Sequence, residues 1–233
     1  MANILLTGAS RGIGAAARIA LTNAGHHVIG QSTAGGDGLI AADFAAPRAA
    51  DALWDHALEA AGGRIDVLVN NAGVFEAADI DDADAFADTW ARSIAINLQS
   101  AADLCRHAVL HFQANGGGRI VNVASRAGHR GDSPKHWHYA AAKGGMLAMT
   151  KTIARGYAAQ NILAFAITPG FTMTGMAEDY LASRGGDKLL ADIPLGRVAG
   201  ADEVAEAIRW LASEAPASLT GATIDINGAS YVR

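Results

Sequence analysis

The sequence predicts an α/β fold in which helices cover both faces of a doubly wound parallel sheet, giving three layers in a single domain. The first observation is that short apolar runs, typical of buried parallel strands, alternate along the chain with longer stretches of helical periodicity. The second is a glycine-rich turn that joins the first apolar run to the first helical stretch. The length of 233 residues suits one core, so we expect residues 1–233 to form one domain.

The first strand, turn and helix together predict a dinucleotide site. Residues 3–6 form an apolar run too short for a helix, and an amphipathic helix is expected over residues 15–24. Between them, Gly8 allows a tight turn, Gly12 lets the backbone approach a pyrophosphate, and Gly14 lets the helix pack on the strand. The N-terminus of the helix offers free N–H groups and a partial positive charge to phosphates. This context predicts a Rossmann-type NAD(P)-binding domain.

The later elements follow from the same periodicities. Further strands are expected at residues 27–31, 39–42, 67–69, 120–123, 162–167 and 223–226, and further helices at residues 49–61, 83–112, 139–159 and 201–213. The link over residues 32–38 is too short and too rich in glycine for a full crossover helix, so we expect a turn there. No repeat and no linker breaks this alternation, which favours a single domain with a parallel sheet.

Bulk properties exclude several classes of function. The net charge of −5 argues against nucleic acid or an anionic membrane surface as the main partner. Cys105 is the single cysteine, which excludes an internal disulfide and fits a reducing cytosol, so we expect a cytoplasmic protein. We expect no leader, and no apolar run approaches the ~20 residues of a membrane span. The scattered histidines give no metal-ligand spacing, so we expect no metal.

A tyrosine and a lysine four residues apart suggest proton-transfer chemistry. Tyr139 and Lys143 would share one face of the helix expected there. A free phenol has a pKa of about 10, and a fixed ammonium one helical turn away lowers that pKa, which makes the phenol a usable general acid or base. Ser125 lies upstream, at the end of a strand. Taken alone, the pair has a structural alternative, a half-buried tyrosine beside a solvated lysine.

Six sequence signals stand in a characteristic order and spacing. They are Thr7, Gly8, Gly12, Ile13 and Gly14; Asn70, Asn71, Ala72 and Gly73; Asn97; Ser125; Tyr139 with Lys143; and Pro169 and Gly170 followed by Thr174. Together they resemble the short-chain dehydrogenase/reductase family from end to end. The tail over residues 193–197 and 221–228 is most similar to that of the 3-oxoacyl-[acyl-carrier-protein] reductases, which implies a role in fatty acid biosynthesis.

The resemblance implies four catalytic residues. Tyr139 would donate a proton to the substrate oxygen as hydride arrives at carbon, and Lys143 would lower the pKa of Tyr139 and hold the nicotinamide ribose. Ser125 would hydrogen-bond the carbonyl and stabilise its developing negative charge. Asn97 would bind a water that links Lys143 to bulk solvent. Two structural alternatives stay open, since Asn97 could satisfy backbone groups in a bent helix and Ser125 could be a strand-end cap.

The choice of cofactor depends on the end of the second strand. Sites that select NAD carry an acidic residue there, about 20 residues past the glycines, which binds the ribose 2′-hydroxyl. Gln31, Ser32 and Thr33 occupy that place, so no carboxylate is present to repel a 2′-phosphate. Arg11 stands where NADP-using relatives contact that phosphate. We therefore predict NADP(H), with Asp37 able to act against it if the short loop folds back.

The resemblance also implies a wider set of cofactor contacts. They are Gly8, Ser10, Arg11, Gly12, Ile13 and Gly14 in the turn; Ser32 and Thr33 after the second strand; Asp43 and Phe44 after the third; Asn70, Ala72 and Gly73 after the fourth; Tyr139 and Lys143; and Pro169, Gly170, Thr172 and Thr174 near the carboxamide. Asp43 would contact the adenine, and Thr172 would act through its backbone.

Two variable segments are expected to form the substrate site. One covers residues 126–138, and the other is a substrate loop over about residues 171–200. The first is basic and aromatic, so it could receive an anionic substrate or a phosphopantetheine arm, or it could be a solvated loop. Carrier-protein reductases usually carry basic residues at positions near which Gly116 and Gln160 stand here, although Arg119 and Arg155 are close. This departure puts docking of an acyl carrier protein in question.

Three functions fit these residues. The first is an NADPH-dependent reductase of 3-oxoacyl thioesters, free or bound to acyl carrier protein. The second is an alcohol dehydrogenase or carbonyl reductase for another small ketone or alcohol. The third is a nucleotide-binding sensor without catalysis, since a fold alone never proves activity. The resemblance also implies a homotetramer that pairs the helices containing Asn97 and Tyr139, although the sequence leaves a dimer open.

Overall fold

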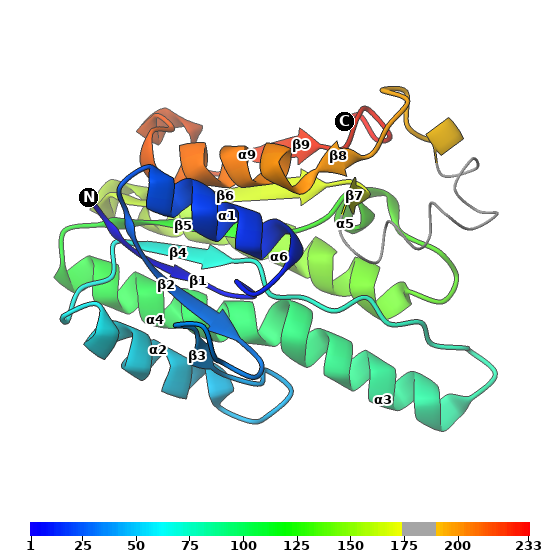
Figure 1. Cartoon of the computed structure of the whole chain (residues 1–233). Coiled ribbons are helices and arrows are strands. Elements are labelled where there is room, and N and C mark those ends of the chain that lie inside the picture. The colour runs from blue at the N-terminus through cyan, green and yellow to red at the C-terminus, as the bar shows by residue number, and fades with distance from the viewer. Residues whose placement is uncertain (174–189) are drawn as a thin grey trace.

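A computed structural model describes residues 1–173 and 190–233 of the chain. Within this part of the chain, seven parallel strands form one sheet in the order β3-β2-β1-β4-β5-β6-β9 (Figure 1). The strands are β1 (Asn3–Leu6), β2 (His27–Ser32), β3 (Ile40–Ala41), β4 (Val67–Asn70), β5 (Gly118–Val123), β6 (Ile162–Pro169) and β9 (Thr223–Ile226). This arrangement confirms the predicted doubly wound parallel sheet.

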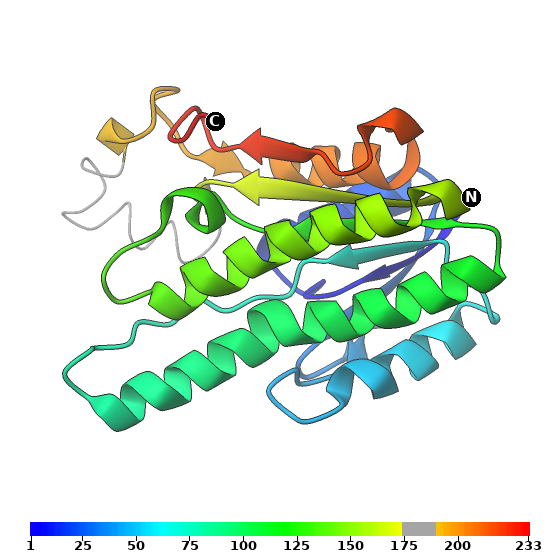
Figure 2. The same cartoon turned by 180° about the vertical axis from the view of Figure 1, so that it is seen from behind.

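Helices cover both faces of the sheet, which confirms the three predicted layers. One face carries α1 (Gly12–Asn23) and α9 (Ala201–Ser213). The other carries α2 (Ala49–Ala60), α4 (Ser100–Ala114) and α6 (Trp137–Tyr157), and Figure 2 shows these three in front of the sheet. Among the helices within residues 1–173 and 190–233, none has the length and apolar character that a membrane crossing requires.

The core is divided by the sheet because side chains alternate along each strand. In β1, Ile4 and Leu6 pack with the layer of α1 and α9, while Leu5 packs with the layer of α2, α4 and α6. All three side chains are fully buried. The run of apolar residues in each central strand therefore reflects burial on both faces.

The long helical segment expected over residues 83–112 contains an irregularity. The structure has α3 (Ala83–Ile94), a π-helical turn (Ala95–Gln99) and then α4 (Ser100–Ala114) without a break in the chain direction. Asp82 caps α3, since its side chain accepts a hydrogen bond from the Ala85 N–H at 3.0 Å. The π turn holds Asn97, and such turns occur frequently at functional sites.

Several short elements were not expected from the sequence. They are α5 (Ala127–Arg130), β7 (Thr172–Met173) and β8 (Ala199–Gly200), each too short to carry a periodic signal. The expected absence of a helix between β2 and β3 is confirmed, and the chain there turns through Gly35, Gly36 and Gly38, all with positive φ. The carboxyl ends of β1, β4, β5 and β6 share one edge of the sheet, and the candidate site lies along that edge.

Candidate active site

The glycine-rich turn after β1 is shaped by the space available at each glycine. Gly8 has φ of +66°, and a Cβ there would lie 2.9 Å from the Ala72 Cα. Gly12 also has positive φ, at +53°. A Cβ at Gly14 would collide with the carbonyl oxygen of Gly8. The backbone at this turn therefore carries no side chains at its glycines, and the approach of a pyrophosphate requires such a turn.

Three polar residues that were not among the expected cofactor contacts hold the glycine-rich turn in place. The Thr7 hydroxyl accepts hydrogen bonds from the Asn71 and Ala72 N–H groups at 2.9 and 3.0 Å, and the Asn71 amide donates to the carbonyls of Thr7 and Gly8. The Gln31 side chain accepts from the Gly8 N–H at 2.8 Å. A sequence signal for Gln31 existed, since it is a polar residue at the end of a buried strand.

The N-terminus of α1 has the features of an anion site. Arg11 at the N-cap makes no side-chain cap, and the first turn contains no acidic residue. Ser10 and Arg11 are exposed, and Ile13 is partly buried. The free N–H groups of this turn therefore face outward without a competing side chain, which fits the phosphates of a dinucleotide.

The end of β2 carries no carboxylate, and the Ser32 hydroxyl there is already hydrogen-bonded within the loop. The Ser32 side chain is buried and accepts a hydrogen bond from the Gly35 N–H at 3.0 Å, so its hydroxyl is engaged in the loop turn. Thr33, the next residue, is exposed. Asp43 is exposed and accepts from the Ala45 N–H at 3.0 Å.

Two predicted cofactor contacts have side chains directed into the core. Phe44 packs in the apolar cluster beneath α2. The Asn70 amide is buried and donates to the Cys105 sulfur at 3.3 Å and to the Asn122 side chain at 2.9 Å. The structure therefore gives the Phe44 side chain a packing role and the Asn70 side chain a role in joining β4 to its neighbours.

The proposed catalytic side chains meet at the carboxyl end of β5. Ser125 follows that strand, and its hydroxyl accepts from the Ala127 N–H at 3.1 Å and lies close enough to Tyr139 to act on the pKa of its hydroxyl. Lys143 lies one turn further along α6, as expected, and its ammonium donates to the Val123 carbonyl at 2.8 Å. The lysine Nζ lies 5.8 Å from the centroid of the Tyr139 ring.

The pKa of Tyr139 differs from the sequence-based expectation. Burial raises the pKa of Tyr139 to about 12, and the hydrogen bond with Ser125 acts in the opposite direction without overcoming it. Lys143 is itself fully enclosed, and this burial lowers the pKa of its ammonium to about 8. The tyrosine pKa is therefore raised and not lowered as expected, because burial has the largest effect on it. Tyr139 is protonated at neutral pH and can serve as an acid.

Asn97 is fully engaged by the segment that follows β4. Its side-chain oxygen accepts from the Val74 N–H at 3.0 Å, and its amide donates to the Val74 carbonyl and the Ser93 hydroxyl, each at 3.0 Å. A Cβ at Gly73 would lie 2.8 Å from the Asn97 oxygen and 3.7 Å from the Lys143 Nζ. Asn97 therefore holds the backbone of the segment after β4 beside Lys143, and not backbone groups inside the bent helix as the structural alternative expected; the water relay stays a prediction.

The end of β6 completes the edge. The Gly170 N–H donates to the Ile226 carbonyl at 3.0 Å, and a Cβ at Gly170 would lie 2.9 Å from the Asn227 Cβ. Thr172 is buried, and its hydroxyl donates to the Gly170 carbonyl at 3.3 Å. Pro169 ends β6 directly before them. Thr174 and most of the predicted substrate loop lie outside the described residues.

An aromatic wall stands beside Tyr139. The ring of Phe75 stacks on His136 with centroids 3.7 Å apart and meets the edge of the Tyr139 ring at 4.9 Å. Burial lowers the pKa of His136, so this wall is uncharged at neutral pH. Phe75 was not singled out from the sequence, although it directly follows the segment that Asn97 holds.

Comparison with known proteins supports a family assignment. Residues 8–229 match the family described as enoyl-(acyl carrier protein) reductase. The chain is 33% identical to the 3-oxoacyl-[acyl-carrier-protein] reductase of Salmonella typhimurium, over 98% of this chain and 96% of that protein. It is 35% identical to acetoacetyl-CoA reductase of Shinella zoogloeoides, over 97% of each. It is 37% identical to cis-4-hydroxycyclohexanecarboxylate dehydrogenase of Sinomonas cyclohexanicum, over 96% of this chain and 94% of that protein.

These matches span nearly the whole chain, and they agree with the bare glycine turn and with the grouping of Ser125, Tyr139 and Lys143 at one edge of the sheet. The family's oxidoreductases use a nicotinamide cofactor, and the bare turn at the N-terminus of α1 fits the phosphates of such a molecule. The chain therefore belongs to the short-chain dehydrogenase/reductase family and is an oxidoreductase similar to the 3-oxoacyl-[acyl-carrier-protein] reductases.

Proposed function

We propose that this protein is an NADPH-dependent reductase of a ketone carbonyl, and that a 3-oxoacyl thioester is its first candidate substrate. The observation that carries the proposal is the grouping of Ser125, Tyr139 and the enclosed ammonium of Lys143 at the carboxyl end of β5. The curated relatives named for 3-oxoacyl and acetoacetyl substrates support the choice of thioester.

Each catalytic residue has a defined task in this proposal. The nicotinamide cofactor supplies the hydride to the carbonyl carbon. Tyr139, protonated at neutral pH, donates its hydroxyl proton to the carbonyl oxygen. Ser125 donates a hydrogen bond to the same oxygen and orients it. The Lys143 ammonium stabilises the phenolate that remains after the proton has left, because opposite charges attract strongly in an enclosed site.

NADPH is proposed over NADH on the basis of charge. No carboxylate stands at the end of β2, and the Arg11 guanidinium is exposed at the glycine turn without an ion pair to any described residue. A 2′-phosphate would therefore meet an arginine and no opposing charge at this place. The test is the dissociation constant of each nucleotide by fluorescence titration; tighter binding of NADH would overturn this part of the proposal.

The reaction is tested by adding an acetoacetyl thioester to purified protein with NADPH and, separately, NADH. Loss of absorbance at the wavelength of the reduced nicotinamide reports turnover, and Tyr139→Phe is the control. Fast NADPH oxidation that requires Tyr139 supports the reductase. Nucleotide binding without turnover of any ketone or alcohol would instead favour a sensor without catalysis.

A dehydrogenase for a cyclic alcohol is the second candidate. The relative from Sinomonas cyclohexanicum is named for a hydroxylated cyclohexane ring that bears a carboxylate. The flat wall of Phe75 and His136 beside Tyr139 suits a ring substrate, because apolar rings pack well against aromatic faces. Oxidation of such alcohols with NADP⁺, in preference to reduction of thioesters, would favour this candidate.

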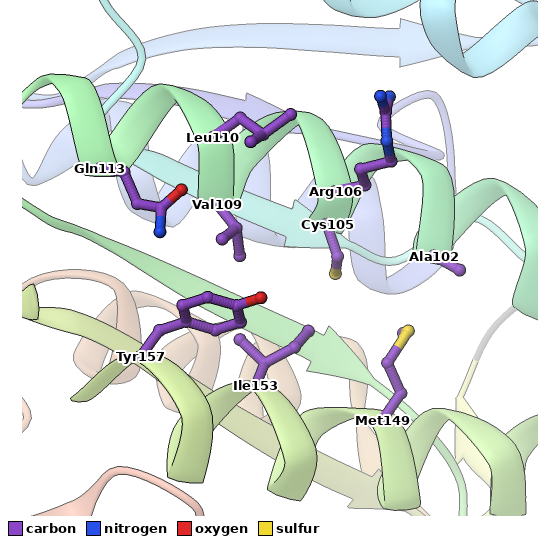
Figure 3. Close-up of a pocket in the computed structure, with 9 residues that line it drawn as sticks. All are labelled: Ala102, Cys105, Arg106, Val109, Leu110, Gln113, Met149, Ile153 and Tyr157. Carbon is purple, nitrogen blue, oxygen red and sulfur yellow. The ribbon is translucent and has the colours of Figure 1, made fainter. Parts of the chain in front are cut away.

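We further propose a homotetramer, with a groove between α4 and α6 as one contact surface between subunits. The groove has a volume of about 390 Å³, and Figure 3 shows Cys105 and Val109 of α4 facing Ile153 and Tyr157 of α6. Leu110 at its rim is 53% exposed. Large exposed apolar side chains beside such a groove favour burial by a second copy.

The lone buried thiol of Cys105 suits a reducing cytoplasm, where we expect the protein to act.

A further inference from the structure

Two arginines directly after the catalytic serine share one acidic partner. Arg126 follows Ser125, and Arg130 ends α5 one helical turn later. Both donate to the same oxygen, Oδ2 of Asp192, at 3.4 and 3.0 Å. Arg130 also donates to the Ser230 carbonyl at 2.9 Å. Two positive charges therefore share one directly bonded carboxylate among the described residues, and Asp132 attracts Arg126 only from beyond ion-pair distance, so one positive charge lacks an ion pair of its own.

The excess charge is largely buried. The Arg126 side chain is only 9% exposed, whereas the Asp192 side chain is 49% exposed. Within residues 1–173 and 190–233, the long contact with Asp192 is the one hydrogen bond that the Arg126 guanidinium makes, and its remaining contact is with the face of Phe171 at 5.5 Å. A guanidinium has five N–H donors, and buried cations are normally well paired. Several Arg126 donors thus make no hydrogen bond to a described residue, although the side chain is nearly enclosed.

Other basic groups of residues 126–138, the rim of the expected substrate site, add no unpaired positive charge. Lys135 forms an ion pair with Asp79 at 2.6 Å. Burial lowers the pKa of His129 and of His136, so neither ring adds charge at neutral pH. The solvated-loop alternative for this rim holds for Lys135 but not for the buried Arg126. The surplus positive charge is therefore concentrated on Arg126 and its neighbour on α5.

The backbone places these arginines at the reacting edge of the sheet. The Arg126 N–H donates to the Pro169 carbonyl at 3.1 Å, which fixes the residue where β5 and β6 both end. The hydroxyl of Ser125, one residue away, accepts a hydrogen bond from the Ala127 N–H and contacts Tyr139. The Arg126 backbone is thereby fixed directly beside the residue expected to bind the substrate carbonyl.

We propose that Arg126 and Arg130 bind a negatively charged group of the substrate, an inference that rests on the reductase function proposed above. The group is a carboxylate close to the reacting carbon or a phosphate on a longer thioester arm, since both present paired oxygens that match a guanidinium. Asp192 holds the two guanidiniums together and competes with the incoming anion. The site selects anionic ketones and alcohols over neutral ones of the same shape.

The test compares two pairs of substrates that differ in charge. One pair is 4-oxocyclohexanecarboxylate and its methyl ester; the other is acetoacetyl-coenzyme A and acetoacetyl-N-acetylcysteamine. We expect wild-type kcat/KM to favour the anionic member of one pair at least about tenfold, corresponding to roughly 1.4 kcal/mol. The pair that shows the preference identifies the source of the anion. Equal turnover within both pairs would overturn the inference while leaving the reductase function intact.

Three variants separate anion binding from a structural clasp. Arg126→Gln should lower kcat/KM for the anionic member about 10- to 100-fold and for the neutral member far less. Asp192→Asn should keep or increase the preference, because a competing anion is removed. If Arg126→Gln and Asp192→Asn instead lower kcat/KM equally for both members of a pair, the cluster only stabilises the fold and the inference fails. Arg48→Gln removes the same charge from the exposed start of α2 and is the matched control.

Direct binding decides the inference even without turnover. Calorimetric titration with 4-oxocyclohexanecarboxylate and with coenzyme A, each against wild-type protein and Arg126→Gln, measures affinity for the anion alone. Binding of either ligand that the variant weakens supports the site. Binding that is equal in the two proteins, or undetectable in both, overturns it, whereas the reductase function stands or falls on the turnover assay.

Discussion

At the scale of single residues, burial decides the chemistry. Spacing alone led us to expect that Lys143 lowers the pKa of Tyr139, but the enclosed hydroxyl has its pKa raised to about 12. Burial shifts the pKa of Lys143 in the opposite direction and lowers it to about 8. An acid that stays protonated and a cation that is near its titration point form a pair suited to donating a proton at neutral pH.

Tyr139→Phe should remove nearly all turnover. We expect kcat to fall about 10²- to 10⁴-fold, the usual contribution of a general acid, with the dissociation constant of NADPH unchanged. The phenylalanine ring keeps the edge contact with Phe75, so folding should be preserved. Steady-state kinetics and nucleotide titration measure both quantities. Activity close to that of the wild type would contradict the proposed proton transfer.

The pH dependence of ketone reduction should report Lys143. Below a pH of about 8 its ammonium is charged and stabilises the developing phenolate; as pH rises through that value the charge is lost. Because kcat/KM reflects ionisations of the free enzyme, it should be flat near neutrality and fall above about pH 8. Any activity that remains in Lys143→Arg should lack this fall, since arginine keeps its charge. A flat wild-type profile up to pH 10 would argue against a role for the charge.

At the scale of elements, close contacts between backbones position the site. The helix α1 lies against the turn at Gly14, α5 lies against α6 where a Cβ at Gly128 would be 2.7 Å from the Lys143 carbonyl carbon, and Gly145 of α6 lies against Leu98. Such glycines bring whole elements within reach of one another. The small residues of α6 are thus used partly within the chain, to set the distance from Lys143 to its surroundings.

Gly14→Ala should damage the nucleotide site. The added methyl collides with the Gly8 carbonyl, and overpacking of this kind costs about 1–3 kcal/mol. We expect weaker NADPH binding and a lower midpoint in urea unfolding. Gly156→Ala is the matched control, because that helical glycine has open space around it and alanine there should stabilise by up to about 1 kcal/mol. Unchanged nucleotide binding in Gly14→Ala would refute this account of the turn.

At the scale of the whole molecule, the two faces of the sheet have different tasks. The face under α1 and α9 is packed by an apolar cluster, whereas the other face presents the groove between α4 and α6 (Figure 3). The carboxyl edge of the sheet is left free for cofactor and substrate. The proposed active site and the proposed subunit contact therefore lie on separate surfaces, so each can be tested independently of the other.

Leu110→Glu should weaken assembly without removing catalysis by the folded chain. A charge at the rim of the groove would have to be buried in the subunit contact, at a cost of several kcal/mol if unpaired. Light scattering should show a smaller particle than the wild type. Ile19→Glu on α1 is the matched control, since that side chain is 62% exposed on the opposite layer. The same particle size for wild type and Leu110→Glu would exclude this groove as a contact.

The sequence by itself determined the strand and helix alternation, the parallel sheet and the glycine turn, because periodicity and positive-φ glycines act over short distances. The resemblance to the family implied the grouping of Ser125, Tyr139 and Lys143. Only the tertiary structure decided the direction of the Tyr139 pKa, the support of the turn by Gln31, and the surplus charge on Arg126. These depend on burial and on partners far away in the chain: Gln31 contacts Gly8 across 23 residues and Arg126 contacts Asp192 across 66. Desolvation and long-range pairing have no signal in a single stretch of sequence.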